Sequence, residues 1–288
     1  MRPQAPTRAE AREATQAFLG SAAAKGGSGG SGPGGSGHRR LFPRKRVVAL
    51  YGSPAMSATI IGRKSVKGAK RKLHHQARPY DRRSRHTVPA FDLVVVLATA
   101  DPGPDHNYRQ RYHSRVIKPY LHAARQLNGR LILDIQPGRS RLLTEVKAYR
   151  EWLARPDVDL ALDAEWNLGP HERPGDPGSV GARELNGVSR YLEGLAERQR
   201  LPAKLMIVHQ FRKGSVHHKQ RIKGRHKVQV TLDFDGIGSR PAKQSGYEKL
   251  SSPALFDGFM LFYRLDDRLM SPKQVLRLDP KPDLVEYQ

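Results

Sequence analysis

Two acidic side chains follow a short apolar run at residues 160–162, and an aromatic residue comes directly after them. Asp163 and Glu165 are two residues apart, and in a β-strand residues i and i+2 point to the same face. Carboxyl groups paired in this way can transfer protons or hold a cation, or they can form a solvated strand end without chemistry. We expect Asp163 and Glu165 to share one face at the end of a buried strand, beside Trp166.

The elements that must position this pair alternate between apolar runs and helical patterns from about Phe42 onward. Such alternation is typical of a parallel α/β sheet. Strands are predicted at 47–51, 88–98, 130–135, 160–163, 204–209, 227–234, 258–263 and 284–287, and helices at 64–75, 115–127, 140–153, 182–198, 242–250 and 271–278. The number of strands and the length predict a single (β/α)8 (TIM-like) barrel over residues 42–288, although a doubly wound open sheet could use the same elements.

The first 41 residues are predicted to be a flexible segment that precedes the barrel. Residues 25–37 read KGGSGGSGPGGSG, which is the composition of a Gly/Ser linker. Residues 1–24 lack the continuous apolar region of a signal peptide, and no apolar run in the chain is long enough to span a membrane. The absence of cysteine excludes disulfides, thiolate metal sites and a cysteine nucleophile.

The net charge of +24 is concentrated in particular segments. Residues 38–86 contain fifteen Lys and Arg against one Asp, and residues 212–227 contain seven Lys and Arg and no acidic residue. Basic segments of this kind attract polyanions such as nucleic acid, anionic lipid or a phosphate-bearing wall polymer. Residues 63–86 contain a single aromatic residue, Tyr80, whereas nucleic-acid modules usually place more stacking side chains among their charges.

Polar residues recur where the predicted strands end, which is where (β/α)8 barrels perform their chemistry. They are Tyr51, Asp134, Gln136, Asp163, Glu165, His209, Asp233, Asp235 and Tyr263. Lys243, after the sixth strand, is expected to reach the same mouth or to be a solvated side chain at a helix start.

These residues predict a glycosidase-like cleft. Glu165 is the expected proton donor, with a pKa raised by apolar surroundings such as Trp166. Asp134, Asp163 or Asp233 would act as base or nucleophile. The rings of Trp166, Tyr51 and Tyr263 would stack on sugars. The structural alternative is that these carboxylates form salt bridges or bind backbone at the barrel mouth.

A metal site and a serine hydrolase receive less support from the sequence. Asp163, Glu165, His209 and Asp233 form a mixed carboxylate and imidazole set that could hold Zn²⁺ or Mn²⁺, but no H-x-H or HExxH spacing accompanies it. No G-x-S-x-G elbow occurs either. We therefore expect neither a metal nor another cofactor.

Several sequence blocks resemble an uncharacterised actinobacterial family whose members are predicted to be secreted or lipid-anchored. Examples are VVALYGSP, LILDIQPGRS, DVDLALDAEWNLGP, KLMIVHQF, DFDGIGSRPAKQ and DGFMLFYR, and the resemblance covers residues 47–288. It implies a glycosidase-like barrel. It also indicates as site residues Asp134, Gln136, Asp163, Glu165, Trp166, His209, Gln210, Lys243, Gln244 and Tyr263.

The resemblance implies an extracellular or cell-envelope location, whereas the sequence shows no signal peptide and no lipid-bearing cysteine, which leaves a cytoplasmic location open. We expect a carbohydrate or an anionic polymer as partner. The predicted function is an envelope-associated glycoside-hydrolase-like barrel that acts on or binds a cell-wall polysaccharide. The alternative is a catalytically inactive barrel that binds a polyanion, either wall polymer or nucleic acid, through residues 63–86 and 212–227.

Overall fold

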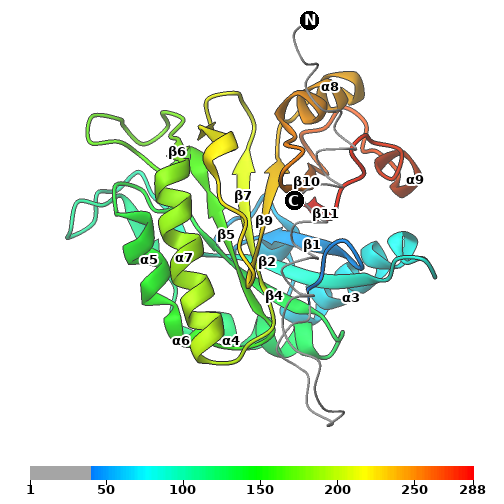
Figure 1. The fold of residues 1–288 in the computed structure, drawn as a ribbon, viewed down its shortest axis with the longest axis horizontal. Coiled ribbons are helices and arrows are strands. Elements are labelled where there is room, and N and C mark those ends of the chain that lie inside the picture. The colour runs from blue at the N-terminus through cyan, green and yellow to red at the C-terminus, as the bar shows by residue number, and fades with distance from the viewer. Residues whose placement is uncertain (1–39) are drawn as a thin grey trace, which may run out of the picture.

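The computed structural model describes residues 40–288 and contains a closed ring of parallel strands. Figure 1 shows these strands in the middle of the molecule with helices around them. The order around the ring is β1-β11-β10-β9-β7-β5-β4-β2, and β2 pairs with β1 to close it. The strands are β1 (Arg46–Gly52), β2 (Thr87–Ala98), β4 (Arg130–Ile135), β5 (Val158–Asp163), β7 (Lys204–Gln210), β9 (Val228–Phe234), β10 (Phe256–Leu261) and β11 (Leu284–Tyr287). The predicted (β/α)8 barrel is confirmed. The predicted flexible segment 1–41 lies, apart from its last two residues, outside the described residues.

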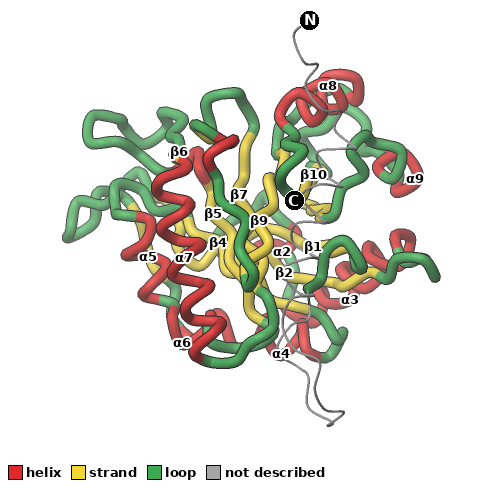
Figure 2. Tube along the Cα trace, viewed as in Figure 1, coloured by secondary structure: helices red, strands yellow, loops and turns green. Residues whose placement is uncertain are grey.

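Helices pack against the outside of the ring (Figure 2). They are α2 (Ile60–Arg63), α3 (Val66–Ala77), α4 (Ser114–Arg125), α5 (Leu142–Ala148), α6 (Arg150–Leu153), α7 (Ala182–Arg198), α8 (Arg240–Leu250) and α9 (Pro272–Val275). The predicted helix 140–153 is divided into α5 and α6 at Tyr149, whose hydroxyl donates 2.7 Å to the carbonyl of Val95 and so ties this point to β2. The connection from β7 to β9 contains no α-helix, and the basic residues 212–227 form it instead.

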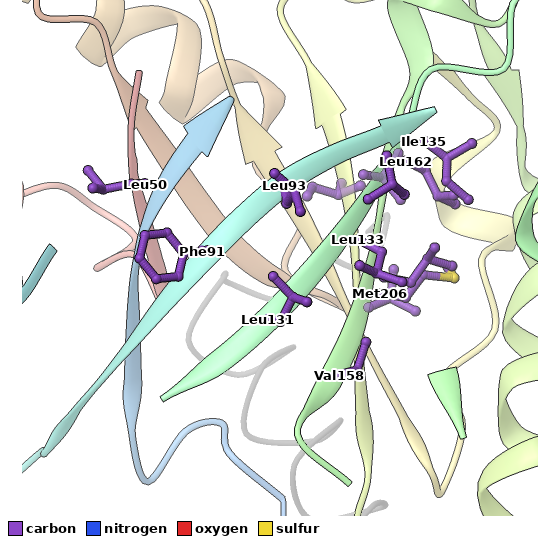
Figure 3. Close-up of a cluster of buried hydrophobic side chains, with 14 of the residues drawn as sticks. Leu50, Phe91, Leu93, Leu131, Leu133, Ile135, Val158, Leu162 and Met206 are labelled. Carbon is purple, nitrogen blue, oxygen red and sulfur yellow. The ribbon is translucent and has the colours of Figure 1, made fainter. Parts of the chain in front are cut away.

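Along each strand, successive residues point alternately into the barrel interior and outward to the surrounding helices. Val47 and Ala49 belong to the interior apolar cluster, whereas Val48 and Leu50 belong to the outer cluster under the helices. Figure 3 shows part of that outer layer, with Leu50, Phe91, Leu93, Leu131, Leu133, Ile135, Val158, Leu162 and Met206 labelled. Burial of this layer is the main force that holds the helices on the sheet.

Apolar side chains fill the amino end of the barrel. Phe42 is buried there, and its ring centroid lies 5.2 Å from that of Phe256. The side chain of Gln229 holds Phe42 in place, because it accepts from the Phe42 amide and donates 2.9 Å to the Phe42 carbonyl. With this end packed, polar side chains concentrate toward the carboxyl ends of the strands.

Short elements that the sequence patterns did not predict accompany the barrel. Strand β3 (Arg109–Arg111) pairs antiparallel with β2, and β6 (Val180–Gly181) pairs with β8 (Val216–His217). The described part of the chain also contains the 3-10 turns η2 (Arg78–Tyr80), η3 (Ala164–Trp166) and η4 (Lys219–Arg221). Within residues 40–288, no helix is both long enough and apolar enough to cross a membrane.

Candidate functional site

A ring of polar side chains forms the uppermost interior layer of the barrel. The alternation that places Val47 and Ala49 inside continues to the carboxyl ends of the strands, where almost every strand contributes a polar residue. These residues are Tyr51, Asp92, Asp134, Asp163, His209, Asp233 and Glu286, each at most 5 % exposed. Strand β10 contributes the apolar Met260. Within the described residues, His209 is the one basic side chain of this layer.

His209 lies at the centre of the ring. Its Nε2 is 3.0 Å from Asp134 Oδ2 and 4.0 Å from Glu286 Oε2, and its Nδ1 is 3.3 Å from Asp233 Oδ2. Burial alone would lower the pKa of His209, but the close carboxylates of Asp134 and Asp233 raise it well above its usual value. The imidazole therefore carries a positive charge at neutral pH when no other cation is present.

A second group connects β1, β4 and β5. Tyr51 Oη donates 3.2 Å to Asp163 Oδ2, and Gln136 Nε2 lies 3.1 Å from the same oxygen and 3.0 Å from Tyr51 Oη. The other carboxyl oxygen of Asp163 has no hydrogen-bond partner. Burial, followed by repulsion from Asp134, raises the pKa of Asp163 well above its usual value. Asp163 therefore holds a proton more readily than an exposed aspartate does, and one of its oxygens is free for a ligand.

A cavity of about 380 Å³ opens above these two groups. Its walls are Tyr51, Met56, Gln136, Asp163, Glu165, Trp166, His209, Phe211, Asp235, Gly236, Ile237, Met260, Phe262, Leu265 and Gln288. This volume falls in the usual range for small-molecule sites. Three carboxyl groups line the cavity, and among these described wall residues there is no Lys or Arg. The cavity of this very basic protein therefore lacks, among its described walls, the Lys and Arg side chains that usually bind a phosphate.

Glu165 reaches the cavity by a different route from the one predicted. Strand β5 ends at Asp163, and Glu165 lies in the 3-10 turn η3 instead of two residues along the same strand. It still lines the same cavity as Asp163 because the turn folds over the strand end. Burial raises the pKa of Glu165, and the positive charge of His209 and a hydrogen bond with Trp166 partly oppose that shift.

Asp235 lines the cavity from the end of β9. Burial raises its pKa to about 7, His209 opposes the shift, and Asp233 and then Glu165 add to it. Glu165 and Asp235 thus interact, and two such carboxyls release their protons in separate steps. Near neutral pH one of them can hold a proton while the other is ionised.

Asp235 gives the fold a pH dependence that can be tested in EDTA-treated protein. Its pKa is 3.8 in the unfolded chain and about 7 in the fold, so the folded state binds the proton more tightly. The stabilisation from the neutral carboxyl is complete below pH 3.8 and is lost as the pH rises through about 7. At pH 8 we expect the free energy of unfolding of Asp235→Asn to exceed that of the parent by about 2 kcal/mol, a value that allows for the partial exposure of the side chain. This difference corresponds to a Tm that is roughly 5 °C higher.

Thermal melts at pH 4, 6 and 8 measure this effect. The gain should shrink steadily toward pH 4, whereas Asp267→Asn, which changes an exposed carboxylate, should leave Tm unchanged throughout. A gain that is the same at every pH would mean that the pKa of Asp235 is not raised in the fold.

The structure separates the predicted site residues into three groups. Tyr51, Gln136, Asp163, Glu165, Trp166, His209 and Asp235 line the cavity. Asp134 and Asp233 lie beneath it, against His209. Gln210, Lys243 and Tyr263 are not among the cavity walls. Gln210 donates to the carbonyl of Leu250, and Tyr263 donates to Gln76 on α3.

Lys243 is held in a buried ion pair instead of extending to the mouth. Its Nζ donates 2.8 Å to Asp266 Oδ1 and 2.9 Å to the carbonyl of Met260, and its side chain is 1 % exposed. The sequence predicted that Lys243 either reaches the barrel mouth or is solvated at a helix start. The structure shows neither position.

Asp92 and Glu286 belong to the ring of polar side chains, but they were not predicted from the sequence as site residues. Each is a single acidic residue inside an apolar strand, in the runs AFDLVVV and LVEY, and not at a strand end. Burial raises the pKa of both, followed by repulsion from Asp134 for Asp92 and from Asp92 for Glu286. The signal that could have found them is an acidic residue in a buried strand, because such a side chain must face a polar interior.

The two basic segments lie on opposite sides of the barrel. Residues 63–86 connect β1 to β2, residues 212–227 connect β7 to β9, and three strands separate β1 from β7 in either direction around the ring. Several cations of the second segment bind the protein itself: Arg225 pairs with Glu193, and Lys219 and Lys227 donate to backbone carbonyls. The segments therefore do not form one continuous basic surface.

No family model and no curated protein matches the chain. Among solved structures, a D-allulose 3-epimerase from Methylomonas sp. is 11% identical, with a TM-score of 0.40 over 86% of both chains. A 3-keto-D-glucoside 4-epimerase from E. coli is 11% identical, with a TM-score of 0.41 over 85% of this chain and 92% of its own. Similarity this low indicates nothing about the activity of this chain. Of the implied family resemblance, the barrel is confirmed, and nothing in these comparisons supports an actinobacterial secreted or lipid-anchored family.

Proposed function

We propose that the cavity binds a carbohydrate and that Glu165 and Asp235 perform acid–base chemistry on it, with hydrolysis of a glycosidic bond as the reaction. The observation that carries this proposal is the composition of the cavity walls. They combine interacting carboxyl groups of raised pKa with aromatic rings and contain no Lys or Arg among the described residues. A polysaccharide of the cell envelope is the first substrate class to test, since the family resemblance implies it.

The carboxyl groups divide the work in the proposed reaction. Protonated Glu165 donates its proton to the leaving oxygen as the glycosidic C–O bond breaks. Asp235, whose pKa of about 7 leaves it about half ionised at neutral pH, takes in its ionised form a proton from the water whose oxygen forms the new bond to the sugar carbon. The reaction consumes one water and leaves one proton on each product, so the two carboxyls must exchange a proton with solvent before the next cycle.

Asp163 has a positioning role in this scheme. Tyr51 and Gln136 hold one of its oxygens, and its raised pKa favours the protonated form, in which the free oxygen can donate a hydrogen bond to a sugar hydroxyl. The indole of Trp166 and the ring of Phe211 provide flat faces that suit the C–H side of a sugar ring. The exposed side chains of Ile237 and Leu265 extend this apolar surface to the rim.

The two tryptophans of the chain allow a direct test of binding. Trp166 lines the cavity, whereas Trp152 lies on the outer side of the barrel on α6. Soluble oligosaccharides released from wall polysaccharide are titrated into Trp152→Phe, which keeps Trp166 as reporter, and into Trp166→Phe. We expect an emission change in Trp152→Phe alone and, by calorimetry, roughly tenfold weaker binding to Trp166→Ala, the usual size of a lost stacking contact.

Two results would count against binding at this cavity. One is calorimetric binding with the same affinity in Trp166→Ala and in the parent. The other is an emission change confined to Trp166→Phe, which would place the ligand near α6.

A further inference from the structure

The barrel interior beneath the cavity contains a second chemical arrangement that the proposed function does not use. Asp92, His209 and Glu286 each offer one ligand atom, and these three atoms all lie within 4.8 Å of one another. The residues come from β2, β7 and β11, three separate strands of the ring, and all three are buried. Ligand atoms about 2 Å from a shared ion lie at most about 4 Å apart, so a small adjustment would bring these into coordination.

The hydrogen bonding of these carboxyl groups indicates a missing partner. The carboxyl groups of Asp92 and Glu286 are buried and face each other, and their oxygens have no hydrogen-bond partner outside this pair in the described structure. Buried polar groups are nearly always satisfied, and an unpaired buried carboxylate is expensive. Two buried carboxyl groups that face each other and one histidine, with no other hydrogen-bond partner, therefore indicate that a cation belongs between them.

The orientation of His209 agrees with coordination through Nε2. Its Nδ1 faces Asp233 at 3.3 Å, while its Nε2 faces the side of Asp134 and Glu286. Histidines that bind metals commonly donate their second ring N–H to a carboxylate, which fixes the ring and the tautomer. Asp233 occupies that supporting position here.

We propose that Asp92, His209 and Glu286 bind a divalent transition-metal ion of the Mn²⁺, Co²⁺ or Zn²⁺ class at the floor of the cavity. One imidazole nitrogen with carboxylate oxygens is the donor set that such ions accept, and it is too rich in nitrogen for Ca²⁺. Asp134, 3.0 Å from Nε2, is placed to complete the coordination. His209 also lines the cavity, so the ion has a path of entry from solvent. This proposal differs from the sequence-based expectation of no metal and does not depend on the identity of the cavity ligand.

The test uses the full chain stripped with EDTA and then dialysed separately against Mn²⁺, Co²⁺ and Zn²⁺. We expect about one ion per chain by elemental analysis for at least one of these metals. At a free metal concentration of about 100 Kd, the Tm should rise by roughly 5–10 °C. Reconstitution with Co²⁺ should also produce a visible d–d absorption band. These readouts require no knowledge of a substrate.

Two variants and one control identify the site. Asp92→Asn and Glu286→Gln should each lower the bound metal below about a tenth of an ion per chain and remove the rise in Tm. Both should fold, because each replaces one of two buried carboxyls that face each other with a neutral amide of similar size, and making both keeps the test valid if one does not. Asp235→Asn, which changes a cavity carboxyl outside the cluster, should retain full metal binding.

Either of two results would overturn the proposal. The first is that none of the three metals is retained or changes the Tm of the parent protein. The second is that Asp92→Asn and Glu286→Gln bind metal as well as the parent does, which would place the ion elsewhere.

Discussion

Replacing Asp159 with alanine is expected to lower the free energy of unfolding by about 3–5 kcal/mol, because the change leaves a buried positive charge without its partner. Asp159 is fully buried on β5, four residues before Asp163, and binds the guanidinium of Arg130 through both oxygens. It also accepts the amide of Leu205 at 2.8 Å, so the variant would lose one hydrogen bond between β5 and β7 at the amino end of the barrel, where the backbone pairing of the two strands remains.

The chain provides a matched control two residues away. Asp157 forms the same two-oxygen contact with Arg125, but the Arg125 side chain is 49 % exposed. Exposed ion pairs of this kind contribute about 0–1 kcal/mol. Urea unfolding of Asp157→Ala should therefore show a small shift in midpoint, and Asp159→Ala a large one. Equal shifts in the two variants would mean that burial does not determine the strength of the Arg130–Asp159 pair.

The barrel could be predicted from the sequence because its strands leave a simple pattern. Runs such as VPAFDLVVVLA are long and apolar because both faces of a parallel strand are buried, and every predicted strand is present. Strand boundaries were less accurate: β10 is Phe256–Leu261 instead of 258–263. The division between α5 and α6 falls at Tyr149, which donates a hydrogen bond to Val95 on β2, and local periodicity cannot reveal such a contact.

The sequence predicted where in the barrel the candidate site lies, but it did not predict all of the residues that form it. Asp163 and His209 were predicted as site residues because they follow apolar strands, and (β/α)8 barrels place their active sites at the carboxyl ends of the strands. Asp92 and Glu286 lie inside apolar runs, and only the closed ring brings them to His209. Lys243 was misplaced because its partner, Asp266, lies beyond the next strand, and nothing local in the sequence indicates that pair.

The acid–base proposal makes the largest prediction for activity. Glu165→Gln preserves the size of the side chain but removes the proton that the leaving oxygen requires, so turnover should fall by about 10²–10⁴-fold. The Tm should change little, because Glu165 is only partly buried at the rim and forms no ion pair among the described residues. Glu151→Gln, which changes an exposed carboxylate on α6, is the matched control.

The most direct test of the central claim, that chemistry takes place in the cavity above His209, is therefore a comparison of turnover rates. The parent, Glu165→Gln and Glu151→Gln proteins are incubated with wall-derived oligosaccharides, and the new reducing ends are counted over time. The proposed function predicts release by the parent and by Glu151→Gln at equal rates, with the release by Glu165→Gln reduced at least a hundredfold. Turnover by Glu165→Gln within about threefold of the parent would contradict the claim.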